Sequence, residues 1–184
     1  MNPWQLPRQV TLEGVDYPHR SDFREIIPIL GVLGDEGKLP LLRWYMALEL
    51  FYEKPIPRQQ EQAAMEYLSA FLTCGEPAAP GPKLLDWQHD GSLIIGDVNV
   101  AAGRELRSEA YVHWWTFLSC FHGIGQGRLS TVVAIRDKLS RGQKLESWEQ
   151  DYLQNNRKTV LLPTPETPAD AAEKARLRQL LGIR

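Results

Sequence analysis

The stretch YVHWWTFLSCF, residues 111–121, constrains the fold more than any other part of the chain. At about 100° per residue, its large side chains, Trp114 and Trp115 among them, cover a wide arc of a helix and leave a narrow strip that includes His113. A helix with so much apolar surface has to be packed on several sides. Residues 109–122 are therefore predicted to form one central helix.

Apolar residues recur at helical spacing in several other stretches of the sequence. In the segment that Pro40 opens, the residues at helical spacing are Leu41, Trp44, Tyr45, Leu48 and Phe51 or Tyr52. The predicted helices are one that Asp22 caps and Pro28 kinks or shortens, residues 40–53, 58–73 and 128–139, and a short helix over 147–157.

The N-terminal stretch QVTLEGVDYPHR, residues 9–20, alternates apolar and polar side chains around a central Glu-Gly. This pattern predicts a β-hairpin in which Val10 and Leu12 pair with Val15 and Tyr17. Because an isolated hairpin is only marginally stable, it must lie on the helices or pair with another strand.

The remaining segments define the domain organisation. The run GEPAAPGPK, residues 75–83, is too rich in proline and glycine for a regular element and is predicted to be a loop. Residues 84–108 could form a helix or a strand, and a helix is favoured. We expect a mainly α protein with a bundle-like helical domain, a small hairpin and a separate C-terminal helix. Its predicted parts are an arm and hairpin at 1–20, the helical domain at 21–158, and an extended linker with the terminal helix at 159–184.

Composition bounds the partners that the chain can bind. Of 184 residues, 43% are hydrophobic, which is enough for a core, and the formal net charge is −2. This charge gives no bulk attraction to nucleic acid or to an anionic membrane. No long unbroken apolar run and no signal-peptide pattern are present, so a soluble protein of the cytosol is expected. Cys74 and Cys120 are expected to be buried free thiols.

Residues that could carry chemistry do not form a recognisable catalytic or metal-binding pattern. His89, His113, Cys120 and His122 lack the spacing of a zinc site. The carboxylates of Asp86, Asp90 and Asp97 are expected to be solvated surface groups. We therefore expect no catalytic residues, no bound metal and no cofactor, and a binding protein rather than an enzyme.

Six tryptophans remain to be explained. Burial of most of Trp114, Trp115 and Phe117 is favoured, and the alternative is that one tryptophan lines a groove for a partner, with His113 beside it. Trp87 lies next to the proline-rich loop, where an aromatic side chain can anchor a partner.

The order of motifs along residues 15–145 adds a resemblance. The motifs are YPHRSDFREI, WQHDGSLI, VHWWTFLSCFHGIG and LSTVVAIRDKLS, and the matching residues within them are Tyr17, Asp22, Phe23, Asp90, His113, Trp114, Trp115, Phe117, Ile135 and Arg136. In these features the chain resembles the phage tail-assembly family called gene product fifteen, from siphophages and prophages of Gram-positive bacteria.

The resemblance implies a non-enzymatic tail-assembly chaperone in the host bacterial cytoplasm. Such a protein binds the tape-measure protein, keeps it soluble, self-associates, and gives way as the tail-tube protein, a further possible partner, polymerises. Neither a membrane nor nucleic acid is an expected partner. The side chains expected to bind the partner are His113, Trp114, Trp115, Phe117, Arg136 and Trp87.

Two alternatives stay open. A helix-turn-helix could form from residues 109–122, the glycine turn and residues 128–139, which would make the chain a small DNA-binding regulator. The chain could also be a structural subunit that stays in the tail of the virion.

Overall fold

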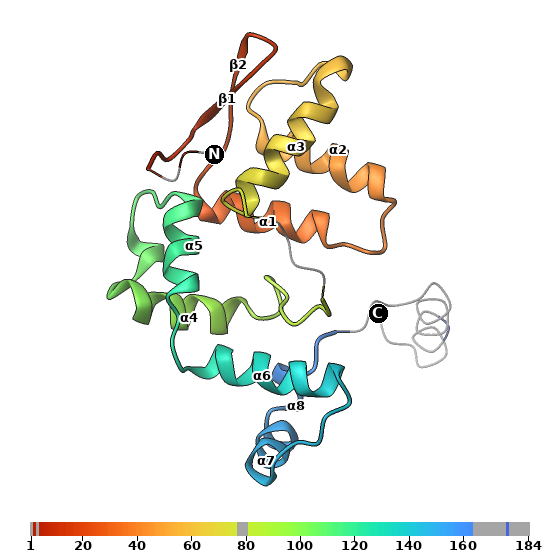
Figure 1. Cartoon of the computed structure of the whole chain (residues 1–184), viewed down its shortest axis with the longest axis vertical. Coiled ribbons are helices and arrows are strands. Elements are labelled where there is room, and N and C mark those ends of the chain that lie inside the picture. The colour runs from red at the N-terminus through yellow and green to blue at the C-terminus, as the bar shows by residue number, and fades with distance from the viewer. Residues whose placement is uncertain (1, 3, 77–80, 164–175, 177–184) are drawn as a thin grey trace.

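The computed structural model of the chain describes residues 2, 4–76, 81–163 and 176. The protein is mainly α, with a two-stranded antiparallel sheet at its N-terminal end (Figure 1). The helices are α1 (Phe23–Leu33), α2 (Pro40–Phe51), α3 (Glu61–Leu72), α4 (Gly91–Ala102), α5 (Trp114–His122), α6 (Arg128–Ser140), α7 (Ser147–Asn155) and α8 (Arg157–Val160). Short 3-10 helices, η1 (Arg58–Gln60) and η2 (Leu106–Ser108), precede α3 and α5.

The helices form three groups along the long axis of the molecule. The hairpin lies beside α1, α2 and α3 at one end, α4 and α5 occupy the middle, and α6, α7 and α8 form the other end (Figure 1). One continuous apolar core links the groups, from Tyr17 in the hairpin through Phe71 and Trp114 to Val160 in α8.

The predicted hairpin and its register are confirmed. Strands β1 (Gln9–Leu12) and β2 (Val15–Pro18) pair Val10 with Tyr17 and Leu12 with Val15. The turn residues Glu13 and Gly14 both have positive φ, +49° and +83°, as a two-residue hairpin turn requires. Tyr17 is buried with its ring edge-on to Tyr52, so the hairpin lies on the helices as expected.

Helix α1 begins at the predicted cap. The Oδ1 atom of Asp22 accepts a hydrogen bond from the backbone N–H of Arg24 at 2.9 Å. The helix continues through Pro28 and ends at Leu33, so proline does not end it.

The central helix starts later than predicted. Helix α5 begins at Trp114, and residues 109–113 are extended rather than helical. The reason is tertiary: Phe23 N donates to Val112 O at 3.0 Å and Trp114 N donates to Ser21 O at 2.7 Å. Residues 21–23 thus hold this segment in an antiparallel bridge, and hydrogen-bonding outside the helix overrides the helical pattern.

The apolar stripe expected over residues 40–53 is only partly buried. Leu48 and Phe51 are buried as expected, but Leu41 and Tyr45 are exposed, and Trp44 is only half-buried. The buried residues of α2, Ala47, Leu48 and Phe51, all lie in its C-terminal half.

The segment from 84 to 108 contains helix α4, which confirms the favoured prediction. The described residues of the predicted loop, 75, 76 and 81–83, contain no helix or strand. Residue 159, where an extended linker was predicted to begin, instead lies in α8, whose Val160 is fully buried. The predicted terminal helix lies outside the described residues, apart from Arg176.

Within the described part of the chain, none of the helices combines the length and apolar character needed to cross a membrane.

Candidate functional site

An apolar cleft of about 350 Å³ lies between α1, α4 and α5. Its apolar lining consists of Phe23, Ile27, Trp87, Ile94, Ile95 and Phe117. Gly91 and two exposed arginines, Arg24 and Arg107, complete the lining. The cleft therefore combines an apolar floor with charged side chains at its edge, as sites that bind an apolar partner do.

Both arginines at the cleft are already paired. Arg24 contacts Asp22 at 2.7 Å, and Arg107 contacts Glu105 at 2.7 Å. The hydrogen bonds from Arg107 lower the pKa of Glu105 to about 2. A ligand at this edge thus meets neutralised ion pairs rather than free positive charge.

Trp87, the aromatic side chain predicted to anchor a partner, lines the cleft. Its ring lies edge-on to Trp114, with a centroid distance of 5.5 Å, and 5.1 Å from the ring of Phe121. The turn that carries Trp87 is fixed by Asp86, whose Oδ1 atom accepts hydrogen bonds from the N–H groups of Gln88 and His89. One face of Trp87 therefore packs on the core while its side chain remains half-exposed.

Phe117 lines the cleft and packs against two other aromatic rings. Its ring stacks on Phe23 with a centroid distance of 4.6 Å and lies parallel to Trp114 at 5.6 Å. Phe117 is itself buried, so the structure brings two of the predicted partner-binding residues, Phe117 and Trp87, to one cleft.

The adjacent tryptophans of α5 lie in the core. Trp114 is 1% exposed and Trp115 is 6% exposed. Their indole N–H groups donate to the last turn of α3, Trp114 to Leu72 O at 3.1 Å and Trp115 to Phe71 O at 2.8 Å. Both indole donors thus reach carbonyls in the last turn of α3, where Phe71 O also accepts a hydrogen bond from Cys74 N. The favoured burial of these tryptophans agrees with the structure, while their partner-binding role stays a prediction.

His113 caps α5 from a buried position. Its Nδ1 atom accepts a hydrogen bond from Trp115 N at 3.0 Å, so the ring proton sits on Nε2 and is donated to Pro7 O at 2.9 Å. Burial lowers the pKa of His113. The neutral ring is used on both sides to join the N-terminal arm to α5, which leaves neither nitrogen free for a partner.

Asp22 connects the same two regions from the other side. Its Oδ2 atom accepts a hydrogen bond from Val112 N at 2.9 Å, while Oδ1 caps α1. Arg24 spans the junction and donates to Glu109 O and Ala110 O. This junction ties the start of α1 to the segment that leads into α5, and both helices line the cleft.

Arg136 forms a buried hydrogen-bonding centre away from the cleft. Its guanidinium group is bidentate to Asp90, at 2.7 and 2.8 Å. The other N–H groups donate to Val160 O, Leu84 O and Thr159 O. The side chains of Arg136 and Asp90 are 5% and 0% exposed, so this predicted partner-binding residue lies at a structural junction of α4, α6 and α8.

The three aspartates expected on the surface instead organise the backbone. Asp90 is buried against Arg136, Asp86 fixes the turn at Trp87, and Asp97 accepts a hydrogen bond from Leu129 N at 2.8 Å, at the start of α6. The sequence signal was their position directly before or within an apolar helix, where a free carboxylate is expensive to bury.

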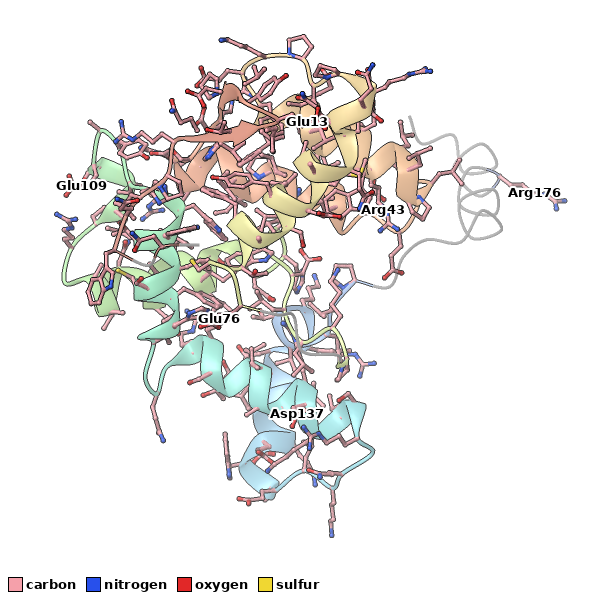
Figure 2. The ribbon with its side chains drawn as sticks, turned by 45° about the horizontal axis from the view of Figure 1, so that its top comes forward. Glu13, Arg43, Glu76, Glu109, Asp137 and Arg176 are labelled. Atoms are coloured by element: carbon pink, nitrogen blue, oxygen red, sulfur yellow. The ribbon has the colours of Figure 1, made fainter. Side chains whose placement is uncertain are left out.

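Three of the basic side chains on α6 and at its C-cap are paired. Arg136 is buried against Asp90, Lys138 contacts Glu149 at 2.7 Å, and Arg141 contacts Asp137, which Figure 2 labels, while Arg128 at the start of α6 is exposed. A DNA-binding helix needs such groups free to contact phosphates or base edges. This arrangement does not favour the helix-turn-helix alternative.

Groups that could support metal or thiol chemistry are dispersed. No cluster of three or more histidine, cysteine or acidic side chains in the described residues could hold a metal ion. Cys74 and Cys120 are free and half-buried, and burial raises the pKa of Cys74 to about 11. A thiol with so high a pKa is mostly protonated at neutral pH and a poor nucleophile.

The isoleucines that line the cleft were not singled out by sequence reasoning. Ile94 and Ile95 belong to a run whose apolar character indicated a buried element but not which face would stay open. Comparison with known proteins adds no assignment: no family model matches the chain, and neither curated proteins nor solved structures give a match.

Proposed function

We propose that the protein is a non-enzymatic phage tail-assembly chaperone that binds an apolar helix of the tape-measure protein in the cleft between α1, α4 and α5. The cleft is the observation that carries the proposal, together with the resemblance of the motifs to a tail-assembly family. Copies of the chain would coat the tape measure in the host cytoplasm and leave as tail-tube subunits polymerise.

The shape and chemistry of the cleft suit one stripe of an amphipathic helix. Helix-in-groove recognition seats apolar side chains at positions i, i+3, i+4 and i+7 in an apolar groove. A cleft of about 350 Å³ accommodates a few such side chains, and Trp87 supplies a rigid aromatic wall. Each site then binds weakly, which fits a chaperone that has to be displaced.

The weakness of one site also explains why several copies would be needed. A long apolar helix offers repeated stripes, and adjacent copies bound along it gain from multivalency without stronger individual contacts. No bond-making step is required for this role.

The test is co-expression of the chain with the tape-measure gene of the same phage genome, followed by measurement of the soluble fraction and of co-purification. The informative variant is Ile95→Gln, which places a polar side chain in the cleft. The matched control is Val100→Gln on the same helix, because Val100 is 82% exposed and lies outside the cleft.

We expect the wild-type chain and Val100→Gln to keep the tape measure soluble, and Ile95→Gln to lose most of the co-purification while its thermal melting stays close to wild type. Loss of an apolar contact of this size corresponds to about a tenfold change in affinity per site. Equal binding by both variants would show that the partner does not use this cleft.

A further inference from the structure

A second cleft, of about 540 Å³, lies along the C-terminal half of α1. Its lining on the α1 side begins at Pro28 and ends at Asp35. The opposite wall is the turn before α4, which Figure 1 shows beside α1, and consists of Lys83, Leu85, Asp86, Trp87 and Gln88. We call this space the second cleft, and the cleft between α1, α4 and α5 the first cleft.

The two clefts are neighbours along α1. Trp87 lines both of them, and on α1 the first cleft ends at Ile27 where the second begins at Pro28. Ile27 in the first cleft and Gly31 in the second lie one turn apart on the same face of the helix. From the start of α1 to Asp35, the two clefts follow the helix for about 18 Å, the length of about three turns of a partner helix.

The second cleft contains a polar side chain where the first is apolar. A Cβ atom built on Gly31 would lie 2.6 Å from Nε2 of Gln88, so the Gln88 side chain lies over the position where α1 has no side chain. Gln88 uses its backbone N–H and C=O in the turn, and among the described residues its exposed side-chain amide has no hydrogen-bond partner. This amide can both donate to a partner and accept from it.

Each charged side chain that lines the two clefts contacts an oppositely charged neighbour. In the second cleft, Lys83 contacts Asp86 at 2.8 Å, and Asp35 contacts Lys38. A partner that binds through phosphates or through a run of charged side chains would have to break these pairs. The lining instead suits a helix face without charge, which has apolar side chains for the first cleft and an amide or hydroxyl group for Gln88.

We propose that one helix of the tape-measure protein lies along α1 and occupies both clefts. Its apolar side chains fill the first cleft. About one turn further along, an amide or hydroxyl side chain hydrogen-bonds the side-chain amide of Gln88 in the second cleft, and Trp87 separates the two kinds of contact. This inference rests on the proposed function and adds to it the orientation of the bound helix and the pattern of its contacting face.

The test repeats the co-expression with two further variants and measures the amount of tape-measure protein that co-purifies per copy of the chain. Gly31→Leu fills the second cleft and displaces Gln88, and its control is Gly96→Leu in α4. Gly96 lies outside both clefts, and no atom of the described residues lies within 4 Å of a Cβ atom built there. Gln88→Ala removes the amide, and its control is Gln59→Ala, at an exposed glutamine outside both clefts.

Photo-crosslinking detects the contact directly. The photoreactive amino acid p-benzoylphenylalanine replaces Lys83, which is exposed at the second cleft. In the control, the same amino acid replaces Val100, which is exposed and lies outside both clefts.

We expect Gly31→Leu to lower the co-purified tape measure about tenfold, because it fills the space of a partner side chain, and Gln88→Ala to lower it about fivefold, as the loss of one hydrogen bond does. Both controls should bind like the wild type, and all four variants should melt close to the wild-type temperature. The tape measure should cross-link to position 83 and not to position 100.

Binding that is lost in Ile95→Gln but kept in Gly31→Leu and Gln88→Ala would overturn this inference and leave the proposed function in place. Equal losses in Gly31→Leu and Gly96→Leu, or no cross-link from position 83, would also overturn it. Loss in Gly31→Leu with full binding by Gln88→Ala would overturn the hydrogen bond to Gln88. A wild-type chain that leaves the tape measure insoluble would overturn the proposed function and this inference together.

Discussion

Arg136 shows how one side chain can hold three helices together. All five N–H donors of its guanidinium group have acceptors, two on Asp90 and three on backbone carbonyls of residues 84, 159 and 160. Buried ion pairs tolerate the cost of desolvation only when their remaining hydrogen-bonding groups are satisfied in this way.

Replacing Arg136 with alanine is expected to lower the free energy of unfolding by about 3–5 kcal/mol, because the Asp90 carboxylate is left buried without a partner. Urea denaturation measures the change. The control is Arg141→Ala, which removes an exposed ion pair with Asp137 and should cost less than about 1 kcal/mol. Similar losses in the two variants would contradict the structural role of Arg136.

The buried histidines predict a pH dependence of stability. His19 stacks on Phe51 and shares hydrogen bonds with Tyr67 and with Arg20 O, and burial lowers its pKa to about 4. Above pH 6.5 the ring is neutral in the folded and unfolded states, so protonation of His19 takes nothing from the free energy of unfolding. As pH falls from 6.5 to about 4, only the unfolded chain takes up the proton, and stability is lost.

The loss from His19 alone is expected to reach about 3 kcal/mol at pH 4, at about 1.4 kcal/mol per unit of pKa difference. His113 adds to it, because burial also lowers its pKa. Urea denaturation at pH 7.5, 6 and 5 measures the slope, which should be shallower in His19→Gln. A free energy of unfolding that stays constant over this range would contradict the neutral, buried histidines.

Among single residues, local chemistry is what the sequence predicted well. The Asp22 cap and the positive-φ turn at Gly14 follow from side-chain and backbone preferences that act over a few residues. The pairing of Arg136 with Asp90 could not be predicted, because the two residues are far apart in sequence and follow no periodic pattern.

At the scale of helices and strands, the junction between α1 and α5 is the critical element. Asp22 contributes to both, as cap of α1 and as acceptor for the buried N–H of Val112. Residues 109–113, Glu-Ala-Tyr-Val-His, were included in the predicted helix, yet they stay extended because residues 21–23 supply backbone hydrogen-bond partners to this segment. Such long-range pairing explains the error in the predicted start of the helix.

Asp22→Ala is expected to lower the free energy of unfolding by about 2–4 kcal/mol, since it removes a helix cap and leaves a buried N–H without an acceptor. Glu25→Ala, in the same first turn of α1, is the control, because the Glu25 side chain is exposed and forms only a 3.5 Å contact with Arg20. Thermal and urea denaturation of both variants would reveal the difference. An equally mild effect of the two substitutions would show that the junction adds little.

The faces of the helices were harder to predict than their positions. In α2, Leu41 and Leu48 are equally apolar in sequence, but only Leu48 meets other elements. Periodicity identifies apolar side chains without saying whether they face the core or another surface. For the same reason, the sequence could not predict that Ile95 lines a cleft instead of packing in the core.

At the scale of the whole molecule, rigid packing and open apolar surface are segregated. The aromatic residues of α5, the Asp22 junction and the Arg136 centre form a packed interior, while the cleft between α1, α4 and α5 is open and the side chains of Leu41 and Tyr45 in α2 are exposed. Exposed apolar patches of this kind mark interaction sites in soluble proteins. A scaffold that adheres to apolar helices needs this combination.

We propose that the chain takes part in tail assembly only transiently. Quantitative mass spectrometry of assembly intermediates and of purified finished particles tests this role most directly. The proposed chaperone role predicts several copies of the chain per tape-measure protein in the intermediates and none in finished tails. A fixed, stoichiometric amount in finished tails would contradict it and identify a structural subunit, and intermediates that contain the tape measure without this chain would contradict it as well.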